Sequence, residues 1–330
     1  RLNSSVELNQ LPVSLLSLGS LLQKRITDPD VVAAGFRKPF PNFPDNYTLA
    51  QALRPYPQYF GVISRNAGVG RNWYDSLQVK VERRFGDWQM MAAYTWSKSL
   101  ALAHYRQVFT QAQVWAQDNY NIRDMKSYLH FDQPHVLNIL NSYDLPIGRG
   151  KRFLNVQSRW LDLIVGHWTI AAAQRYYSGN LIKVQAPNTL GSGVLLTRFK
   201  KANVTGNPIR TGVSRTSLDP DNPGIRWFNH GERSPFALPG QFQLGNAAIF
   251  YGDFRNPPIL GENVSIQKRF KFNYAADRSV DLVYRADAFN LFNRTCFGGV
   301  VGTVGNANFG RPTAPQLGPR IITMGLRLDF

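Results

Sequence analysis

Cysteine is almost absent from this chain of 330 residues, in which Cys296 is the single example. One cysteine excludes an internal disulfide and a zinc site built from cysteines. Long apolar runs are absent as well, because no stretch of about 18 consecutive apolar residues occurs, and an ordinary transmembrane helix is therefore excluded. The mean hydropathy of −0.28 agrees with this exclusion.

Acidic residues are few relative to basic ones: 21 Asp and Glu stand against 38 Lys and Arg, for a net charge of +17. Such a surplus indicates an anionic partner, and the two candidates are nucleic acid and the lipopolysaccharide outside a Gram-negative cell. The chain begins Arg1-Leu2-Asn3 with no methionine and no signal segment. We therefore expect a mature secreted protein or a fragment.

Patterns that carry catalysis or bind cofactors are missing too. The histidines show no metal-ligand spacing, no GxSxG motif occurs, and Cys296 has no neighbouring base. The PIGRGK stretch at 146–151 lacks the complete spacing of a phosphate loop and is interpreted as a turn. Asp281 and Asp287 alternate with Arg285, which favours cross-strand salt bridges in a polar lumen over paired general acids. We expect no enzyme activity, no cofactor and no metal site. The histidines concerned are His104, His130, His135, His167 and His230.

What the sequence does contain is a hairpin pattern at residues 74–99. Along the first arm, Leu77, Val79 and Val81 alternate with Gln78 and Lys80, which places apolar and polar side chains on opposite faces of a strand. The stretch Phe85-Gly86-Asp87 predicts a tight turn. The second arm carries its aromatic residues at both ends, with Trp88 at the start and Tyr94 and Trp96 at the close.

Two folds are compatible with this pattern of alternating residues. In a soluble sandwich the apolar face packs on a second sheet, and aromatic residues can fall anywhere along it. In an outer-membrane barrel the apolar face meets lipid, and aromatic residues collect at both ends of each strand. Each arm has about the 10 residues that cross a bilayer at a tilt of about 45°.

The rest of the chain repeats the strand pattern between loops of alternating length. Strands are expected at residues 135–145, 167–177, 263–272, 280–292 and 320–330, with a partial strand at 1–9. Residues 10–71 are expected to be irregular, apart from a helix at 12–24. Connections near Gly86, Gly148 and Ala275 are short or moderate, whereas those after Ser99, Ser178 and Asn293 are long. All short connections fall at one end of the strands, which favours the barrel.

The predicted fold is therefore all-β: an antiparallel up-and-down transmembrane β-barrel segment, about seven or eight strands of a larger barrel, with long outer loops. The predicted concave face includes Gln78, Lys80, Glu82, Thr95, Arg285, Asp287, Thr323 and Arg327. The predicted convex, membrane-facing set is Leu77, Val79, Val81, Trp88, Met90, Ala92, Tyr94, Trp96, Ile139, Trp168, Ile170, Ile266, Leu282, Tyr284, Met324, Leu326 and Leu328.

Several blocks in this order resemble the C-terminal half of Oar-like TonB-dependent outer-membrane receptors of the acidobacterial, carboxypeptidase-regulatory-like type. The blocks are ALRPYPQY at 52–59, YDSLQVKVERRF at 74–85, YTWSKSL at 94–100, DLPIGRGKRF at 144–153, RWFN at 226–229, RADAFNLFN at 285–293 and NFGRPT at 308–313. The last strand, which ends at Phe330, also matches, and its terminal aromatic residue resembles the signal that the barrel-assembly machinery recognises.

The resemblance implies a protein of the Gram-negative outer membrane that passes a substrate with energy from TonB and performs no chemistry on it. Residues 1–330 would be the C-terminal part of the barrel, and the signal peptide, regulatory-like domain and plug of the family are not seen in the sequence. TonB would then act only through the missing N-terminal part, and the substrate stays unknown. Receptors of this class have about 22 strands, so this chain would supply wall strands and outer loops.

Two rival functions stay open. One is a structural or adhesive outer-membrane β-protein that transports nothing, which a plug domain upstream in the gene would exclude. The other is a soluble basic β-protein that binds nucleic acid, although the strand aromatics are not interleaved with Lys and Arg as in a stacking platform. We therefore expect membrane lipid, lipopolysaccharide and the barrel-assembly machinery as partners, and no nucleic acid.

One basic run is a candidate anion contact. Between residues 198 and 215 the chain carries cations and no Asp or Glu, and the run falls in the long outer loop after Tyr177. We expect either a solvated loop or a contact with lipopolysaccharide phosphates or an anionic ligand at the barrel mouth. The cations are Arg198, Lys200, Lys201, Arg210 and Arg215.

Overall fold

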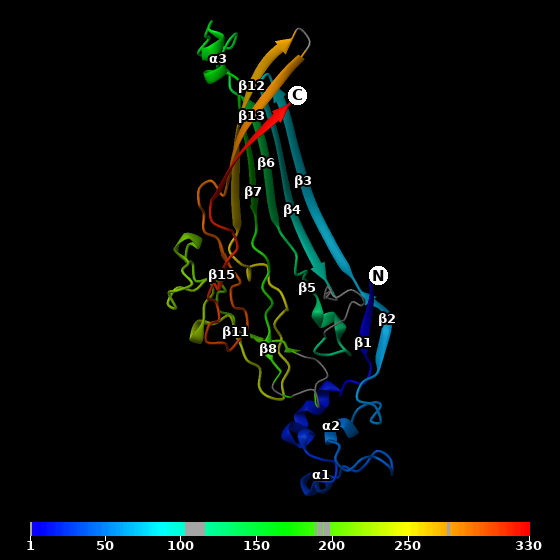
Figure 1. The fold of residues 1–330 in the computed structure, drawn as a ribbon. Coiled ribbons are helices and arrows are strands. Elements are labelled where there is room, and N and C mark those ends of the chain that lie inside the picture. The colour runs from blue at the N-terminus through cyan, green and yellow to red at the C-terminus, as the bar shows by residue number, and fades with distance from the viewer. Residues whose placement is uncertain (1, 103–115, 189, 191–193, 195–198, 276–277) are drawn as a thin grey trace.

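A single antiparallel sheet of long strands dominates the computed structural model (Figure 1), which describes residues 2–102, 116–188, 190, 194, 199–275 and 278–330. Its strand order is β16-β13-β12-β7-β6-β4-β3, with the short β5 beside β4. The strands are β3 (Asn72–Phe85), β4 (Trp88–Ala101), β5 (Ser127–Tyr128), β6 (His135–Asp144), β7 (Trp168–Tyr177), β12 (Ile259–Ala275), β13 (Arg278–Phe289) and β16 (Ile321–Asp329). Neighbours in the chain are neighbours in the sheet, so the topology is up-and-down, as predicted.

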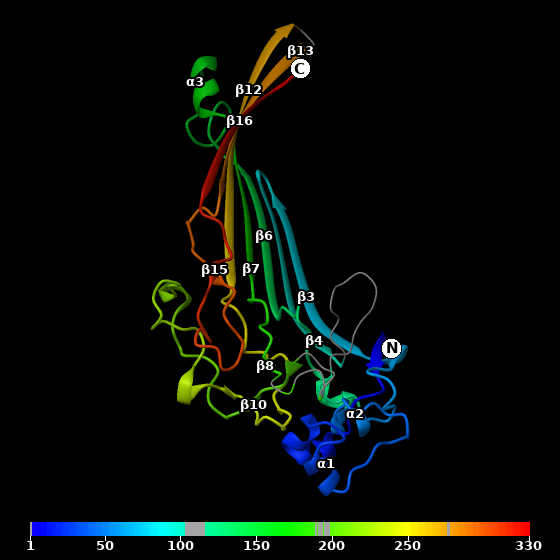
Figure 2. The ribbon, with the colours of Figure 1, turned by 60° about the horizontal axis from the view of Figure 1, so that its bottom comes forward.

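The connections between strands differ in length at the two ends of the large sheet. At one end, called the short-turn end, β3 joins β4 through Gly86, whose φ of 54° suits a two-residue hairpin turn. The connection between β6 and β7 lies at the same end and holds helix α3 (Arg159–Val165). The long connections after β4, β7 and β13 gather at the opposite, loop end (Figure 2). The predicted separation of short and long connections is confirmed.

The strands are staggered as they are in a barrel wall. One row of paired residues crosses the sheet through Phe85, Trp88, Tyr143, Ile170, Ile266, Ala286 and Met324. Phe85 ends β3 at the short-turn end, whereas Met324 lies in the half of β16 nearer the loop end. Paired residues that cross the sheet therefore shift from the short-turn end of β3 toward the loop end of β16. Such a shift between the first and the last strand is the shear that tilted barrel strands require.

The hydrophobic cores lie in the loop layer and not under the sheet. One cluster packs Phe228, Phe236, Phe254 and Phe309 together, and the other clusters also belong to loop segments. Every residue of β3 and of β16 is exposed, and among the described residues no second sheet covers the apolar face. A soluble sandwich needs such a cover, so that alternative is wrong.

Small elements stiffen the loop layer. The helices there are η1 (Val13–Gln23), α1 (Pro29–Ala33), α2 (Leu49–Ala52), η2 (Ile122–Met125), η3 (Arg215–Ser217) and η4 (Gly231–Arg233). The short strands are β8 (Ala186–Pro187), β9 (Phe199–Lys200), β10 (Asn203–Val204), β11 (Phe236–Ala237), β14 (Phe297–Gly298) and β15 (Ala314–Pro315). The helix predicted at 12–24 is the 3₁₀ segment η1, which Gly19 interrupts with a φ of 60°. No described helix is long and apolar enough to cross a membrane.

The N-terminal part differs from the prediction. β1 (Leu2–Glu7) does not join the large sheet as a partial strand; it pairs with β2 (Ile63–Gly70) in a separate two-stranded sheet. The interpretation of residues 10–71 as irregular apart from one helix missed β2, because its polar and glycine-rich sequence, ISRNAGVG, has no clear alternation. Within the described part of the chain, the open edges of the large sheet are thus β3 and β16, and not β16 and the N-terminal strand.

Candidate functional site

The apolar face of the large sheet is the most extensive candidate site. Directly paired residues point to the same side of a sheet, so the register can be followed from strand to strand. Leu77 pairs with Trp96, Val79 with Tyr94 and Val81 with Ala92. Continued through β6, β7, β12, β13 and β16, the pairing places every residue of the predicted membrane-facing set on this one face. Sequence alternation alone was therefore enough to sort them.

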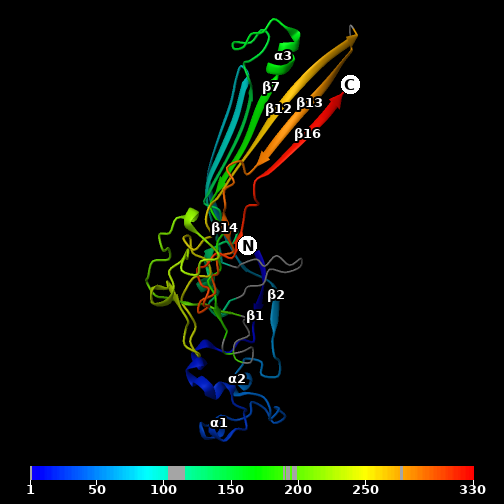
Figure 3. The ribbon, with the colours of Figure 1, turned by 60° about the vertical axis from the view of Figure 1, so that its left-hand side comes forward.

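This face is apolar and convex, and among the described residues no second sheet covers it. Met324 is 72% exposed and Leu326 is 70% exposed, values that a soluble protein rarely allows for large side chains in a contiguous patch. α3 lies on the outer side of the bent sheet (Figure 3), and Lys268, whose side chain belongs to the apolar face, donates to the carbonyl of Gly166 at the end of α3. The predicted convex orientation thus agrees with the structure.

The opposite, concave face is polar. Gln78 pairs with Thr95, and Asp287 pairs with Thr323 and Ser265, so these residues share that side. Its charges are largely neutralised in place: Arg285 Nε lies 2.8 Å from Asp287 Oδ1, and Lys80 Nζ lies 2.5 Å from Glu82 Oε1. Both pairs join residues two apart on one strand, whereas a cross-strand bridge was expected for Arg285. The cross-strand pair Arg269–Asp281 is longer, at 3.9 Å.

Several polar residues interrupt the apolar face, and sequence reasoning did not single them out. Asn141 donates to Gln174 across β6 and β7 at 3.4 Å. Glu262, which is 3% exposed, accepts from Arg294 Nε at 3.0 Å. Each group has a partner, as a polar group must when no water reaches it. The only signal in the sequence was a break in the alternation, which cannot show which partner the fold supplies.

The basic run in the outer loop requires a correction. Lys200 and Lys201 are each 1% exposed, so neither side chain can make the predicted surface contact. Lys200 Nζ donates to the carbonyls of Gly240 and Gln241 at 2.9 Å, and Lys201 Nζ lies 2.6 Å from Asp124 Oδ2. A run of cations in a loop looked solvated, but the loop layer folds over these two lysines and pairs them with oxygens far along the chain.

Two other members of this run, Arg210 and Arg215, lie on other segments of the loop layer. Arg210 donates from Nε to the carbonyl of Asp253 at 3.0 Å, and its guanidinium lies 4.1 Å from the centre of the Trp227 ring. Burial lowers the pKa of Arg210 to about 10. Arg215 belongs to η3 and is half-buried. Arg198 lies outside the described residues. The structure does not gather the four described cations, Lys200, Lys201, Arg210 and Arg215, into one anion site.

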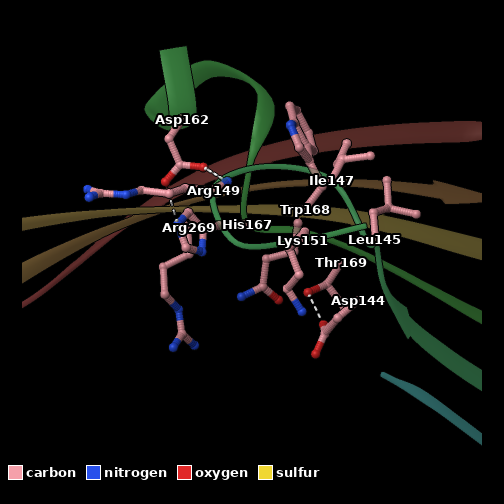
Figure 4. A pocket seen from close by; sticks show the side chains of 11 residues that line it. Asp144, Leu145, Ile147, Arg149, Lys151, Asp162, His167, Trp168, Thr169 and Arg269 are labelled. Carbon is pink, nitrogen blue, oxygen red and sulfur yellow. Dashed lines mark hydrogen bonds and ion pairs between the residues drawn. The ribbon is translucent and has the colours of Figure 1, made fainter. Parts of the chain in front are cut away.

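A pocket of about 270 Å³ lies at the short-turn end, between the connection that holds α3 and strands β7 and β12 (Figure 4). Asp162 Oδ1 accepts from the backbone N–H of Arg149 at 2.6 Å, and Thr169 donates to Asp144 Oδ1 at 2.6 Å. Its lining combines Asp144, Leu145, Ile147, Arg149, Lys151, Asp162, His167, Trp168, Thr169, Gln267 and Arg269.

The same contacts explain why the PIGRGK stretch is a turn and not a phosphate loop. A phosphate would need the backbone N–H groups of the turn, and these are occupied. The Arg149 N–H donates to Asp162, and the Gly150 N–H donates to Asn155 Oδ1 at 2.9 Å. The hydrogen bond from Arg149 is the main cause that lowers the pKa of Asp162. In the described part of the chain no three His, Cys, Asp or Glu residues are grouped so that they could hold a metal ion.

Comparison with known proteins agrees with the geometry of the sheet. No curated protein matches the chain. A family model described as the outer membrane beta barrel domain matches residues 1–323, which is nearly the whole length. An antiparallel, staggered sheet with an uncovered apolar face and long loops at one end is the architecture of that family. The chain therefore belongs to the outer membrane beta barrel domain family.

Proposed function

We propose that this outer-membrane protein supplies wall strands and extracellular loops to a TonB-dependent receptor, through which a substrate passes without covalent chemistry. The single observation that supports this best is the division of the sheet into a convex apolar face and a concave polar face. A lipid-facing exterior and a polar lumen are what a transporting barrel needs. The family resemblance of the sequence blocks supplies the TonB part of the proposal.

The open edges support a wall that is wider than these strands. In the described residues β3 pairs only with β4, and β16 pairs only with β13. Backbone groups at a free edge within hydrocarbon would each cost several kcal/mol. In β1, Leu2 pairs with Gly70, so a strand that ran in the same register ahead of Leu2 would lie beside the edge of β3. Further strands on both sides would complete the hydrogen bonds.

The lipid and protein partners follow from the same assignment. The convex face would contact phospholipid and the lipid portion of lipopolysaccharide, and the basic loop layer would lie near the lipopolysaccharide phosphates. β16 ends beside Phe330, which is 98% exposed, and this free edge is the kind of strand that the barrel-assembly machinery could pair with. Enzyme activity and nucleic-acid binding are not part of the proposal.

Adjacent residues of β3 give a direct test of the two faces. In a Cys296→Ala background, Gln78→Cys and Val79→Cys would be treated with a membrane-impermeant maleimide in isolated outer membranes. We expect rapid labelling of Gln78→Cys from the lumen and slow labelling of Val79→Cys, because lipid would shield the latter. Equal labelling of the two neighbours would contradict the assignment of the faces.

The TonB part has its own test. The DNA upstream of the codon for Arg1 would be read for a plug domain in the same frame, and the intact protein would be tested for cross-linking to TonB in the periplasm. A plug domain together with a TonB cross-link supports the receptor. If neither is found, the better-supported function is a structural or adhesive outer-membrane protein. The observation in its favour is that the loops form a layer with hydrophobic cores of its own.

A further inference from the structure

Helix α3 carries an apolar surface that the sheet does not use. Trp160 is 78% exposed and Ile164 is 66% exposed, and these two residues lie one helical turn apart with Leu161 beside them. Phe153 and Leu154, earlier in the same connection, are exposed as well. A connection that met only water would have no reason to present large apolar side chains of this kind.

The helix is fastened to the apolar side of the sheet. Lys268, on β12, pairs with Trp168 and Tyr284 and so belongs to the convex face. Its Nζ donates to the carbonyl of Gly166 and, at 3.2 Å, to the carbonyl of Ile164. The indole N–H of Trp168 donates to the Ile164 carbonyl at 3.3 Å. These bonds satisfy two carbonyls at the C-terminal end of α3, those of Ile164 and the C-cap Gly166.

The same contacts indicate how deep α3 lies. Lys268 is 1% exposed, and its Nζ lies 5.2 Å from the ring centre of Trp168. A lysine on a lipid-facing strand reaches toward the polar boundary, and tryptophan and tyrosine collect at that same boundary. Because Lys268 donates to carbonyls at the end of α3, the helix lies at the border of the apolar band and not far out in the periplasm.

The charges around α3 match a phospholipid surface. From residue 145 to residue 161 the chain has cations and no Asp or Glu. Arg152 and Arg159 are exposed beside the apolar residues. Anionic headgroups attract such cations, while Trp and Leu enter the boundary between headgroups and acyl chains. Asp162, the first acid after the run, is held by Arg149 and His167.

We propose that α3 lies in the plane of the bilayer, at the headgroup boundary of the leaflet nearer the short-turn end. Trp160, Leu161 and Ile164 enter the phospholipid, and Arg152 and Arg159 contact phosphates. The occupant of this surface is phospholipid, because the surface continues the convex face of the sheet. The inference rests on the proposed lipid contact of that face and adds an interfacial anchor outside the strands.

The test compares three positions in the intact protein, reconstituted in vesicles of phosphatidylethanolamine and phosphatidylglycerol. Trp160→Cys, Met324→Cys and Val32→Cys would each carry a fluorescent label in the Cys296→Ala background. Met324 is an exposed residue on the apolar strand face, and Val32, on α1 at the loop end, is 56% exposed. Because Trp160 is itself exposed, its replacement removes little packing. Brominated lipid quenches labels in the bilayer, and iodide quenches labels in water.

We expect bromolipid to quench the labels at Met324 and Trp160, with the shallower depth at Trp160, and iodide alone to quench the label at Val32. If the label at Trp160 behaves like that at Val32 while Met324 reports lipid, the inference on α3 is wrong and the proposed function stands. If neither quencher reaches Trp160, a protein covers α3, and the inference is again wrong. If the label at Met324 is quenched only by iodide, the lipid-facing assignment itself fails.

Discussion

At the scale of single residues, the side of the strand matters more than the residue type. Thr323 and Met324 are neighbours on β16 and both are exposed, yet the register assigns them to opposite faces. Thr323 pairs with Asp287 on the polar side, and Met324 pairs with Ala286 on the apolar side. The same charge introduced at Thr323 or at Met324 should therefore change the free energy of unfolding in a bilayer by different amounts.

We predict that Met324→Arg lowers the free energy of unfolding in a bilayer by roughly 2–4 kcal/mol, because a guanidinium would meet hydrocarbon. Thr323→Arg is the matched control and should cost much less, since its side chain would meet the polar lumen. Denaturant titration of both variants of the intact protein in phospholipid vesicles measures the difference. Equal losses for the two variants would count against the assignment of the faces.

The loop layer contains ion pairs that the sequence did not predict. Asp132 is completely buried and forms an ion pair with Arg255, and its Oδ1 also accepts from the backbone N–H of Ser99 at 2.5 Å. Lys201 and Asp124 form a second pair in the same layer. The buried pair Asp132–Arg255 holds a particular arrangement of segments, because either charge left alone would cost several kcal/mol. Neither pair has a sequence signature, since its partners are far apart along the chain.

At the scale of elements, the connection between β6 and β7 depends on one carboxylate. Asp162 joins α3 to the turn through the Arg149 N–H and lies 3.3 Å from His167 Nε2. Gly148 stands nearby with a φ of 111°, and a Cβ there would lie 2.7 Å from the Cα of Gly166. The turn and the helix are therefore packed closely around this carboxylate.

We predict that the α3 connection loosens in acid. The backbone N–H of Arg149 lowers the pKa of Asp162 below its ordinary 3.8 in the folded protein. The stabilisation is therefore complete above that ordinary value and is lost as the pH falls through the folded value. Limited proteolysis of the connection between about pH 5 and pH 2 measures this loss. Asp162→Asn, which cannot gain a proton in this range, should be loosened at every pH; an unchanged acid response in this variant would refute the assignment.

At the scale of the whole molecule, the open sheet and the folded loop layer behave differently. The loops bury their own hydrophobic clusters, whereas the strands expose apolar side chains on one face and free backbone groups on both edges. Free edges and exposed apolar faces both promote aggregation in water. A bilayer and further strands would remove the two problems together.

We predict that residues 1–330 produced alone are insoluble in buffer and need detergent. The edges of β3 and β16 would pair with other copies, and the convex face would associate. Size-exclusion chromatography after refolding, with and without detergent, measures this behaviour. A monodisperse monomer in plain buffer would contradict the proposed membrane wall.

The sequence by itself determined the long strands of the large sheet, their two faces and the separation of short from long connections. Alternation is a local property of an extended backbone, so Leu77 and Gln78 had to point to opposite sides whatever else the chain did. Hairpin turns such as that at Gly86 are local as well. These are the features that family membership reflects, and they could be predicted without coordinates.

Only the tertiary structure decided which loop residues are buried, where the N-terminal strand pairs and where α3 docks. Lys200 and Lys201 are covered by segments distant in sequence, β1 pairs with β2 across a long loop, and Lys268 reaches the carbonyls of α3. Each of these three features depends on contacts between segments that are distant in sequence. The energies of such contacts are similar to those of many other possible pairings of segments. Local pattern holds no information about which distant segment supplies the partner. For that reason the surface position predicted for Lys200 and Lys201 was wrong, while the sorting of strand residues into two faces agrees with the register.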